Sequence, residues 1–110
     1  AQAQSFIVEN FSQEKITSVF KDNDEYEVYF NNGSKIEFNK NGSWKDIFCP
    51  DGVPIDILPI KAKEYLGTNY PTTIILEVEK KYNVYEVTLQ NQLEIIFNSD
   101  GDFLSKKWDT

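Results

Sequence analysis

The chain of 110 residues contains an internal duplication, because a shift of 59 positions aligns it with itself without a gap. Of the 51 overlapping pairs, 13 are identical, and Tyr26-Glu27-Val28 falls on Tyr85-Glu86-Val87. A repeated segment of about 50 residues is one supersecondary unit that cannot bury its apolar face alone. We therefore expect one domain of two repeats, 1–49 and 60–108, which share a core and are joined by a linker over 50–59.

Each repeat is predicted to be a short helix followed by four antiparallel strands. Apolar residues recur at helical spacing from Ala3 to Phe11 and from Ala62 to Tyr70, and Pro71 ends the second helix. Alternating apolar and polar residues then indicate the strands. The expected strands are 16–21, 26–30, 35–39 and 43–48 in the first repeat, and 73–80, 85–89, 94–98 and 102–107 in the second. The fold class is α+β, with both helices on one face of the sheet.

The spacing of the apolar residues also predicts the turns. Val28 and Ile36 should face the same core, and directly opposed residues share a face, so the loop between them holds an odd number of residues. We expect a three-residue loop over 31–33, with Gly33 in the left-handed conformation. The second repeat has Gln92 at the matching position. That difference predicts either a strained turn or another turn type there.

Composition excludes several functions. The net charge is −7 and the pI is near 4.5, so the chain lacks the basic footprint of a nucleic-acid-binding protein. The sequence contains no His, which removes the usual general base and the commonest zinc ligand. Cys49 is the single cysteine and stands among apolar residues, so it is expected to be a buried, inert thiol. No apolar run reaches the ~20 residues of a membrane span.

The face of the sheet away from the helices holds the candidate binding residues. The predicted register places Glu27 opposite Glu37 and Tyr29 opposite Lys35, with Lys45 beyond Glu37. One interpretation is a polar, aromatic-edged patch that meets a cation or a basic partner group. The other is a solvated face whose lysines neutralise the carboxylates. The candidate partner-binding residues are Glu27, Tyr29, Glu37, Glu86 and Ile96.

Ile96 interrupts the polar pattern of this face. Ile74 and Leu76 join it in one register of their strand, which the sequence leaves open. An apolar patch on an open face is typical of a protein-binding surface. Catalysis by a pair such as Glu27 and Glu37 is disfavoured, because acid/base carboxylates need a cleft and unequal environments. The chain is expected not to be an enzyme.

Calcium binding is the alternative function. Oxygen ligands at alternating positions suit calcium, although the spacing here does not match an EF-hand and turn chemistry also explains these residues. No other cofactor is expected. The candidate metal ligands are Asp22, Asp24, Asn98, Asp100 and Asp102.

The segment Tyr26–Lys45 (YEVYFNNGSKIEFNKNGSWK) resembles the PepSY-like, beta-lactamase-inhibitor-like family of small exported bacterial proteins. The second repeat carries the resemblance through Pro71, Tyr85-Glu86-Val87 and 97–101. The resemblance implies one curved antiparallel sheet with the helices on one side. It also implies export to the periplasm or secretion. The Ala-Gln-Ala-Gln start agrees with a mature end after signal-peptide cleavage, and a trimmed chain would look the same.

These observations predict a non-enzymatic, exported binding module that acts on a protein partner, as an inhibitor or a regulator, through the open sheet face. Calcium responsiveness is the alternative. The expected oligomeric state is a monomer or a weak homodimer, without nucleic acid and without a membrane span.

Overall fold

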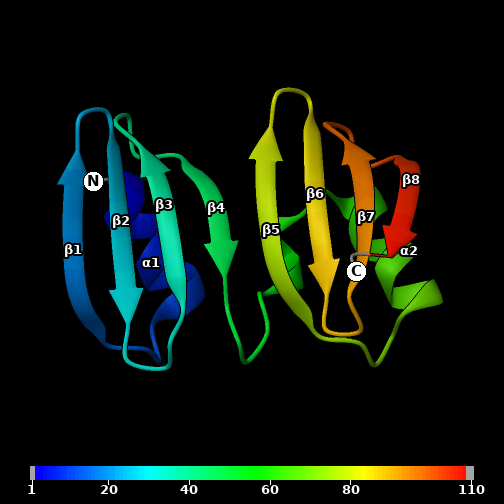
Figure 1. Ribbon diagram of the computed structural model, residues 1–110, viewed down its shortest axis with the longest axis horizontal. Coiled ribbons are helices and arrows are strands. Elements are labelled where there is room, and N and C mark those ends of the chain that lie inside the picture. Colours follow the sequence, from blue (N-terminus) through cyan, green and yellow to red (C-terminus); the bar gives the residue numbers. More distant parts are fainter. Residues whose placement is uncertain (1, 109–110) are drawn as a thin grey trace.

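The computed structural model describes residues 2–108 and shows two helices on one face of an eight-stranded antiparallel sheet (Figure 1). The strands follow one another in chain order, so the sheet is open and has β1 and β8 at its edges. The first unit consists of α1 (Gln2–Phe11), β1 (Ile16–Asp22), β2 (Glu25–Phe30), β3 (Lys35–Asn39) and β4 (Trp44–Phe48). The second consists of α2 (Ile60–Asn69), β5 (Ile75–Lys81), β6 (Val84–Leu89), β7 (Leu93–Asn98) and β8 (Phe103–Trp108). The predicted α+β class, with two helix-plus-four-strand units, is confirmed.

A row of directly paired apolar side chains crosses the sheet and forms the centre of the core. Successive residues of a strand face opposite sides, so every second row of cross-strand pairs points toward the helices. The row consists of Val28, Ile36, Ile47, Val78, Val87 and Ile95, none more than 5% exposed. Burying each of these side chains contributes about 1.5–3 kcal/mol relative to leaving it in water.

The helices pack through contacts that the duplication has copied. Phe6 of α1 meets Phe38 edge-to-face, with ring centroids 6.1 Å apart, and stacks on Trp44. Tyr65 of α2, which aligns with Phe6, meets Phe97 edge-to-face at 5.5 Å and stacks on Phe103. The same aromatic set therefore anchors each helix to the sheet of its own unit.

The two units meet where β4 pairs with β5. Three residue pairs form this seam, centred on Ile47 opposite Val78. The segment after β4 continues along β5, since the Cys49 N–H donates to the Leu76 carbonyl and the Val53 N–H to the Ile75 carbonyl, both at 2.8 Å. A short 3-10 helix, η1 (Ile55–Ile57), then leads to α2. One sheet thus runs through both units.

The turns follow the predicted parity. The Phe30 N–H donates to the Ser34 carbonyl across the three-residue loop 31–33, and Gly33 has the expected left-handed φ of 89°. Gln92 has the same conformation, with φ 72°, so this turn keeps its type without glycine. Another turn type is therefore excluded, and strain is what a left-handed glutamine implies.

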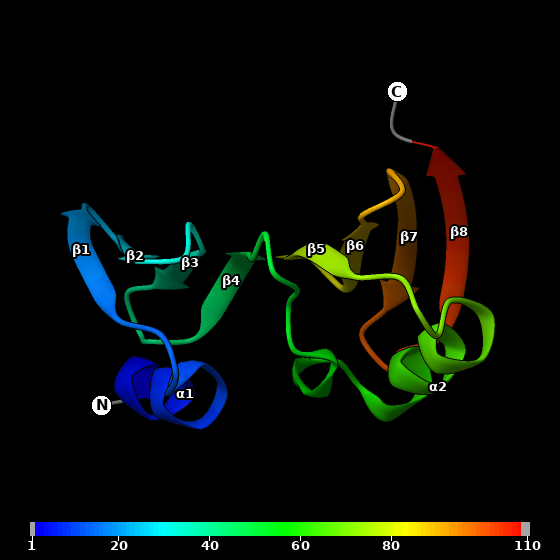
Figure 2. The ribbon, with the colours of Figure 1, turned by 90° about the horizontal axis from the view of Figure 1, so that it is seen from below.

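Both edge strands turn away from the helices, so the face without helices is concave (Figure 2). This concave face is the open face on which partner binding was predicted.

Candidate functional site

Carboxylates on five neighbouring strands line up across the concave face. Cross-strand pairs join Glu27 to Glu37, Glu37 to Asp46, Asp46 to Glu79, and Glu79 to Glu86. The row lies one residue along from the buried apolar row, so its side chains point to the opposite side of the sheet. We call these five residues the acid row. Like charges directly opposed in a sheet are destabilising, so the acid row lowers the stability of the fold.

Apolar residues stand at both ends of the acid row. Phe20 of β1 pairs with Glu27, is 56% exposed and meets the Tyr29 ring edge-to-face at 5.7 Å. At the other end Ile96 of β7 pairs with Glu86. The five predicted partner-binding residues therefore all lie on this face, although their role stays a prediction.

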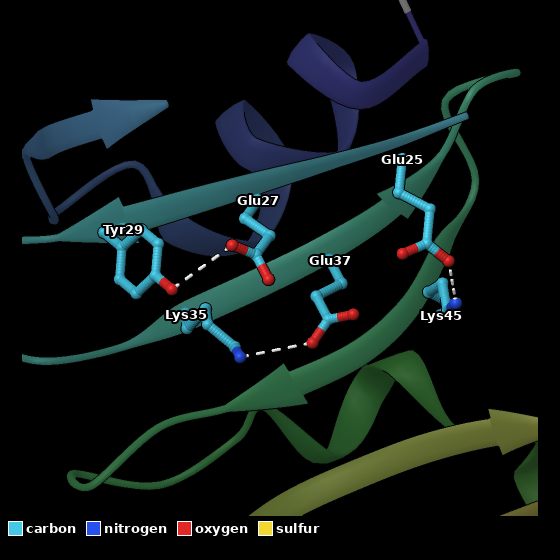
Figure 3. Close-up of polar contacts among 6 residues, drawn as sticks. All are labelled: Glu25, Glu27, Tyr29, Lys35, Glu37 and Lys45. Atoms are coloured by element: carbon cyan, nitrogen blue, oxygen red, sulfur yellow. Dashed lines mark hydrogen bonds and ion pairs between the residues drawn. The ribbon is translucent and has the colours of Figure 1, made fainter. Parts of the chain in front are cut away.

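The register of the first three strands confirms most of the predicted contacts. Glu27 lies opposite Glu37, and Tyr29 lies opposite Lys35. The Tyr29 hydroxyl donates to the Glu27 carboxylate at 3.4 Å, and Lys35 Nζ lies 3.2 Å from Glu37 (Figure 3). Burial opposes the charged form of Lys35, but the hydrogen bond and charge of Glu37 outweigh it and raise the pKa of Lys35.

The predicted position of Lys45 beyond Glu37 is wrong. A register shift between Glu37 and Phe38 inserts Lys45 as an extra residue of β4, so Asp46 stands opposite Glu37. Lys45 forms its ion pair with Glu25 instead (Figure 3). A β-bulge re-aims side chains in this way without a clear mark in the sequence.

Lysines neutralise the flanks of the concave face but not its centre. Beside the pairs made by Lys35 and Lys45, Lys81 Nζ lies 3.1 Å from Glu86 and Lys107 Nζ lies 3.6 Å from Glu94. Within residues 2–108, no lysine forms an ion pair with the three carboxylates of the seam, which are Asp46, Glu77 and Glu79.

Asp46 is the most perturbed of these groups. Burial, together with the carboxylates of Glu77 and Glu37, raises the pKa of Asp46 to about 7. Its Oδ1 atom is buried and has no hydrogen-bond partner among the described residues. Burial also raises the pKa of Glu79, against the opposing charge of Lys81. The centre of the face thus holds carboxylates that no lysine contacts in an ion pair among the described residues, so repulsion and burial outweigh the attraction of Lys35 and Lys81.

Asp46, Glu77 and Glu79 were not predicted from the sequence. One of the registers left open for their strand placed the apolar Ile74 and Leu76 on this face, but a register shift between Ile75 and Glu77 makes Glu77 and Glu79 the cross-strand partners of Thr88 and Glu86. Glu79 aligns with Phe20 of the first repeat, so the duplication offered no hint of a carboxylate. The alternation of polar and apolar residues in Glu77-Val78-Glu79 was the sequence feature that could have indicated these carboxylates.

The candidate calcium ligands lie in two separate turns. Asp22 and Asp24 flank the β1–β2 turn, whereas Asn98, Asp100 and Asp102 form the β7–β8 turn. Asn98 Oδ1 accepts the N–H groups of Asp100 and Asp102 at 3.0 and 2.9 Å, which is ordinary turn chemistry.

Asp102 is engaged in the contact between its turn and α2. Its carboxylate accepts a hydrogen bond from Asn98 and lies 3.2 Å from Lys61 Nζ, and both interactions lower the pKa of Asp102. In the part of the chain that the structure describes, no three His, Cys, Asp or Glu side chains converge as a metal site would require. Neither of the two ten-residue helices is long and apolar enough to cross a membrane.

Comparisons with known proteins agree with this fold. Residues 24–105 match a family described as "Putative beta-lactamase-inhibitor-like, PepSY-like". A solved structure from Bacteroides thetaiotaomicron, described as a "putative calcium-regulated periplasmic protein", is 35% identical, with a TM-score of 0.86 over 96% of this chain and 87% of that chain.

Two structures from Bacteroides vulgatus, both described as "putative periplasmic" proteins, are 34% and 32% identical, with TM-scores of 0.88 and 0.84. They cover 96% of this chain and 87% and 89% of their own. Among curated proteins no match is found. With most of its length matched, the chain belongs to the PepSY-like, beta-lactamase-inhibitor-like family.

Proposed function

We propose that this chain is a non-enzymatic binding module whose concave face captures a basic segment of a partner protein. The observation that carries the proposal is the acid row, with its seam carboxylates left without lysine partners. A cationic segment bound across the acid row would offset the repulsion between its carboxylates. Charge complementarity of this kind gives specificity and speeds association.

The dimensions of the row indicate the size of the segment. Four steps between strands, each of about 4.8 Å, make the row about 19 Å long. An extended chain rises about 3.3 Å per residue, so about six residues span it. Lysine or arginine at alternate positions would meet the carboxylates, and the exposed Phe20 would pack against an apolar residue beyond them.

Inhibition or regulation of the partner is the role that we propose for this capture. The family description compares the family with β-lactamase inhibitors, which supports a protein partner. The sequence contains no His to serve as a general base, and the acid row lies on an open face, which supports a non-enzymatic role. Periplasmic location is part of the proposal, supported by three related structures described as periplasmic.

A hexalysine peptide is a suitable first probe for this function. We expect it to perturb the backbone resonances of β2 to β6 in a titration at low ionic strength, and to bind more weakly as salt screens the charges. The double variant Glu27→Lys/Glu37→Lys should bind it much more weakly. Thermal unfolding of that variant should stay close to that of the parent chain.

The matched control is Glu9→Lys/Glu64→Lys, which makes the same change in net charge on the exposed sides of the two helices. It should leave most of the binding intact. Equal losses in both double variants would reduce the effect to net charge, and unchanged binding by Glu27→Lys/Glu37→Lys would contradict the proposed face.

Calcium responsiveness is the second candidate function. It is favoured by the related Bacteroides thetaiotaomicron protein that is described as calcium-regulated. The residues that we assign to it are Asp22 and Asp24 in one turn, and Asn98, Asp100 and Asp102 in the other. These turn residues are exposed, or half-buried in the case of Asn98, and each set lies in a single loop.

Thermal unfolding in calcium and in excess chelator tests this second function. A ligand present at ~100 times its dissociation constant adds roughly 2.7 kcal/mol to the stability of a chain that binds it only when folded. A rise of many degrees in the melting temperature with calcium, absent with magnesium and lost in Asp100→Asn/Asp102→Asn, would establish it. Equal melting temperatures in calcium and in chelator would contradict calcium responsiveness.

A further inference from the structure

The two copies of the first strand of each unit differ sharply in exposure. Ile75 and Val78 of β5 are 5% and 0% exposed, whereas their repeat mates on β1, Ile16 and Val19, are 43% and 58% exposed. Both strands carry a register shift at the same place and make the same pairing with the next strand. The difference therefore comes from what covers each strand on its other side.

On β5 the cover is β4 and the segment that follows it. Ile47 lies opposite Val78, and the Cys49 and Val53 N–H groups donate to carbonyls of β5. At the other end of the strand, Trp44 covers two side chains. Its ring lies 4.3 Å from Lys80 Nζ and its centroid lies 6.2 Å from that of Tyr85.

On β1 the surface that matches the β4-contacting surface of β5 is present, but no strand packs on it. The repeat mates of Lys80 and Tyr85 are Lys21 and Tyr26, and Lys21 Nζ lies 5.8 Å from the Tyr26 ring centroid. Because β1 is an edge strand, its outer backbone groups have no strand partner within residues 2–108. Such an edge is a template for an added strand.

An apolar groove of about 580 Å³ lies beside this edge, between α1 and the first strands. Ile7, Val19, Tyr26 and Phe38 are among its lining residues. Lys40 is the one charged side chain among the described residues that line it. A basic segment is therefore disfavoured here, in contrast to the acid row on the other face.

We propose that the free edge of β1, with this groove, binds an extended segment of another protein that adds a ninth strand to the sheet. The segment presents an aromatic side chain to Lys21 and Tyr26 and, three residues later, a β-branched aliphatic side chain to Val19. This is the arrangement of Trp44 and Ile47 on β5. The site is separate from the concave face and does not depend on the function proposed for it.

A peptide with the sequence of the segment that packs on β5 tests this site. The probe is residues 44–58 of this chain with Cys49→Ser, titrated into the isotope-labelled full chain. We expect saturable shift changes confined to β1 and the first turns of α1. Val19→Lys should weaken binding by about tenfold or more, because it removes an apolar contact and buries a charge. A probe that also carries Trp44→Ser should fail to bind.

The matched control is Val8→Lys on α1, since Val8 is 67% exposed and does not line the groove. It should change the affinity less than twofold. Shift changes at β5 would overturn the proposal, because the peptide would then be displacing β4. So would the absence of saturable shifts at millimolar peptide. Sedimentation that depends on protein concentration and is abolished by Val19→Lys would also overturn it, because a second copy would then occupy the edge.

Discussion

At the scale of single residues, Asp46 links the acid row to the stability of the fold. Its pKa is about 7 in the folded chain against an ordinary value of 3.8. Below pH ~4 the group is protonated in both states. Between pH 4 and 7 the folded chain holds the proton more tightly than the unfolded chain, so the free energy of unfolding falls as pH rises through this window and then levels off.

We expect Asp46→Asn to raise the free energy of unfolding at pH 8 by on the order of 1–3 kcal/mol, allowing for solvent screening of this half-buried group. The fall in stability between pH 4 and 7 should become shallower. Urea unfolding at four pH values between 4 and 8 measures both effects. The exposed Asp24→Asn is the control, and a parallel pH dependence in the two variants would contradict the assignment.

Gln92 stands in a turn for which strain was one of the two outcomes predicted from the sequence. It occupies the left-handed conformation that its repeat mate Gly33 adopts freely, and that conformation costs a non-glycine residue roughly 1–2 kcal/mol. Part of the gain from glycine is lost to the greater freedom of the unfolded chain. We expect Gln92→Gly to raise the free energy of unfolding by about 0.5–1 kcal/mol.

Chemical denaturation of Gln92→Gly beside Gly33→Ala measures this strain. An added Cβ at Gly33 would meet Pro50 at an ordinary 3.4 Å, so any loss in Gly33→Ala comes from the backbone conformation. The two changes should have opposite signs. A destabilised Gln92→Gly would show that the Gln side chain contributes more than its conformation costs.

At the scale of elements, the duplication provides matched pairs of positions with different surroundings. Ile75→Ala should lower the free energy of unfolding by about 2–5 kcal/mol, because β4 and its following segment bury this side chain. Ile16→Ala, at the exposed repeat mate, should cost less than about 1 kcal/mol. Urea unfolding measures both changes, provided that the slope of the free energy against urea concentration stays the same. Similar losses in the two variants would contradict the claim that β4 and its following segment bury Ile75 while Ile16 stays exposed.

The elements themselves were predictable because their signals are local. Alternation along Tyr26–Phe30 and a glycine at 33 determine a hairpin and place Glu27 opposite Glu37. The bulge that inserts Lys45 has no such signal, because it depends on how β4 lies against both of its neighbours. Half of the candidate site therefore followed from the sequence, and the seam carboxylates required the long-range pairing of β4 with β5.

At the scale of the whole molecule, the continuous sheet predicts that the two units unfold together. Trp44 lies in the first unit and Trp108 in the second, while circular dichroism follows the sheet as a whole. We expect a single transition in urea, with tryptophan fluorescence and circular dichroism giving the same midpoint. Separate midpoints would show that the seam between β4 and β5 does not couple the units.

The two proposed binding surfaces of the molecule prefer different ligands, one a basic segment and the other an apolar one. The concave face carries the acid row, whereas the groove beside β1 is mostly apolar and has Lys40 as its charged lining residue among those described. Their separation on different sides of the sheet lets each be altered without the other. The variants proposed for the two sites can therefore be combined in one chain, and each should change the binding of its own ligand by the same factor as it does alone.

The lysines of β8 distinguish this strand from β4, its counterpart in the first unit. In β4, Ile47 and Phe48 join the first unit to the second, and the matching residues of β8 are Lys106 and Lys107. A third unit would have to lay its first strand over these charges. β8 is thus a charged edge strand, and charges of this kind disfavour pairing with a further strand. With Lys106→Ile/Lys107→Phe this edge would match β4, and we expect β8 of one copy to pair with β1 of the next, so that the chains assemble head to tail.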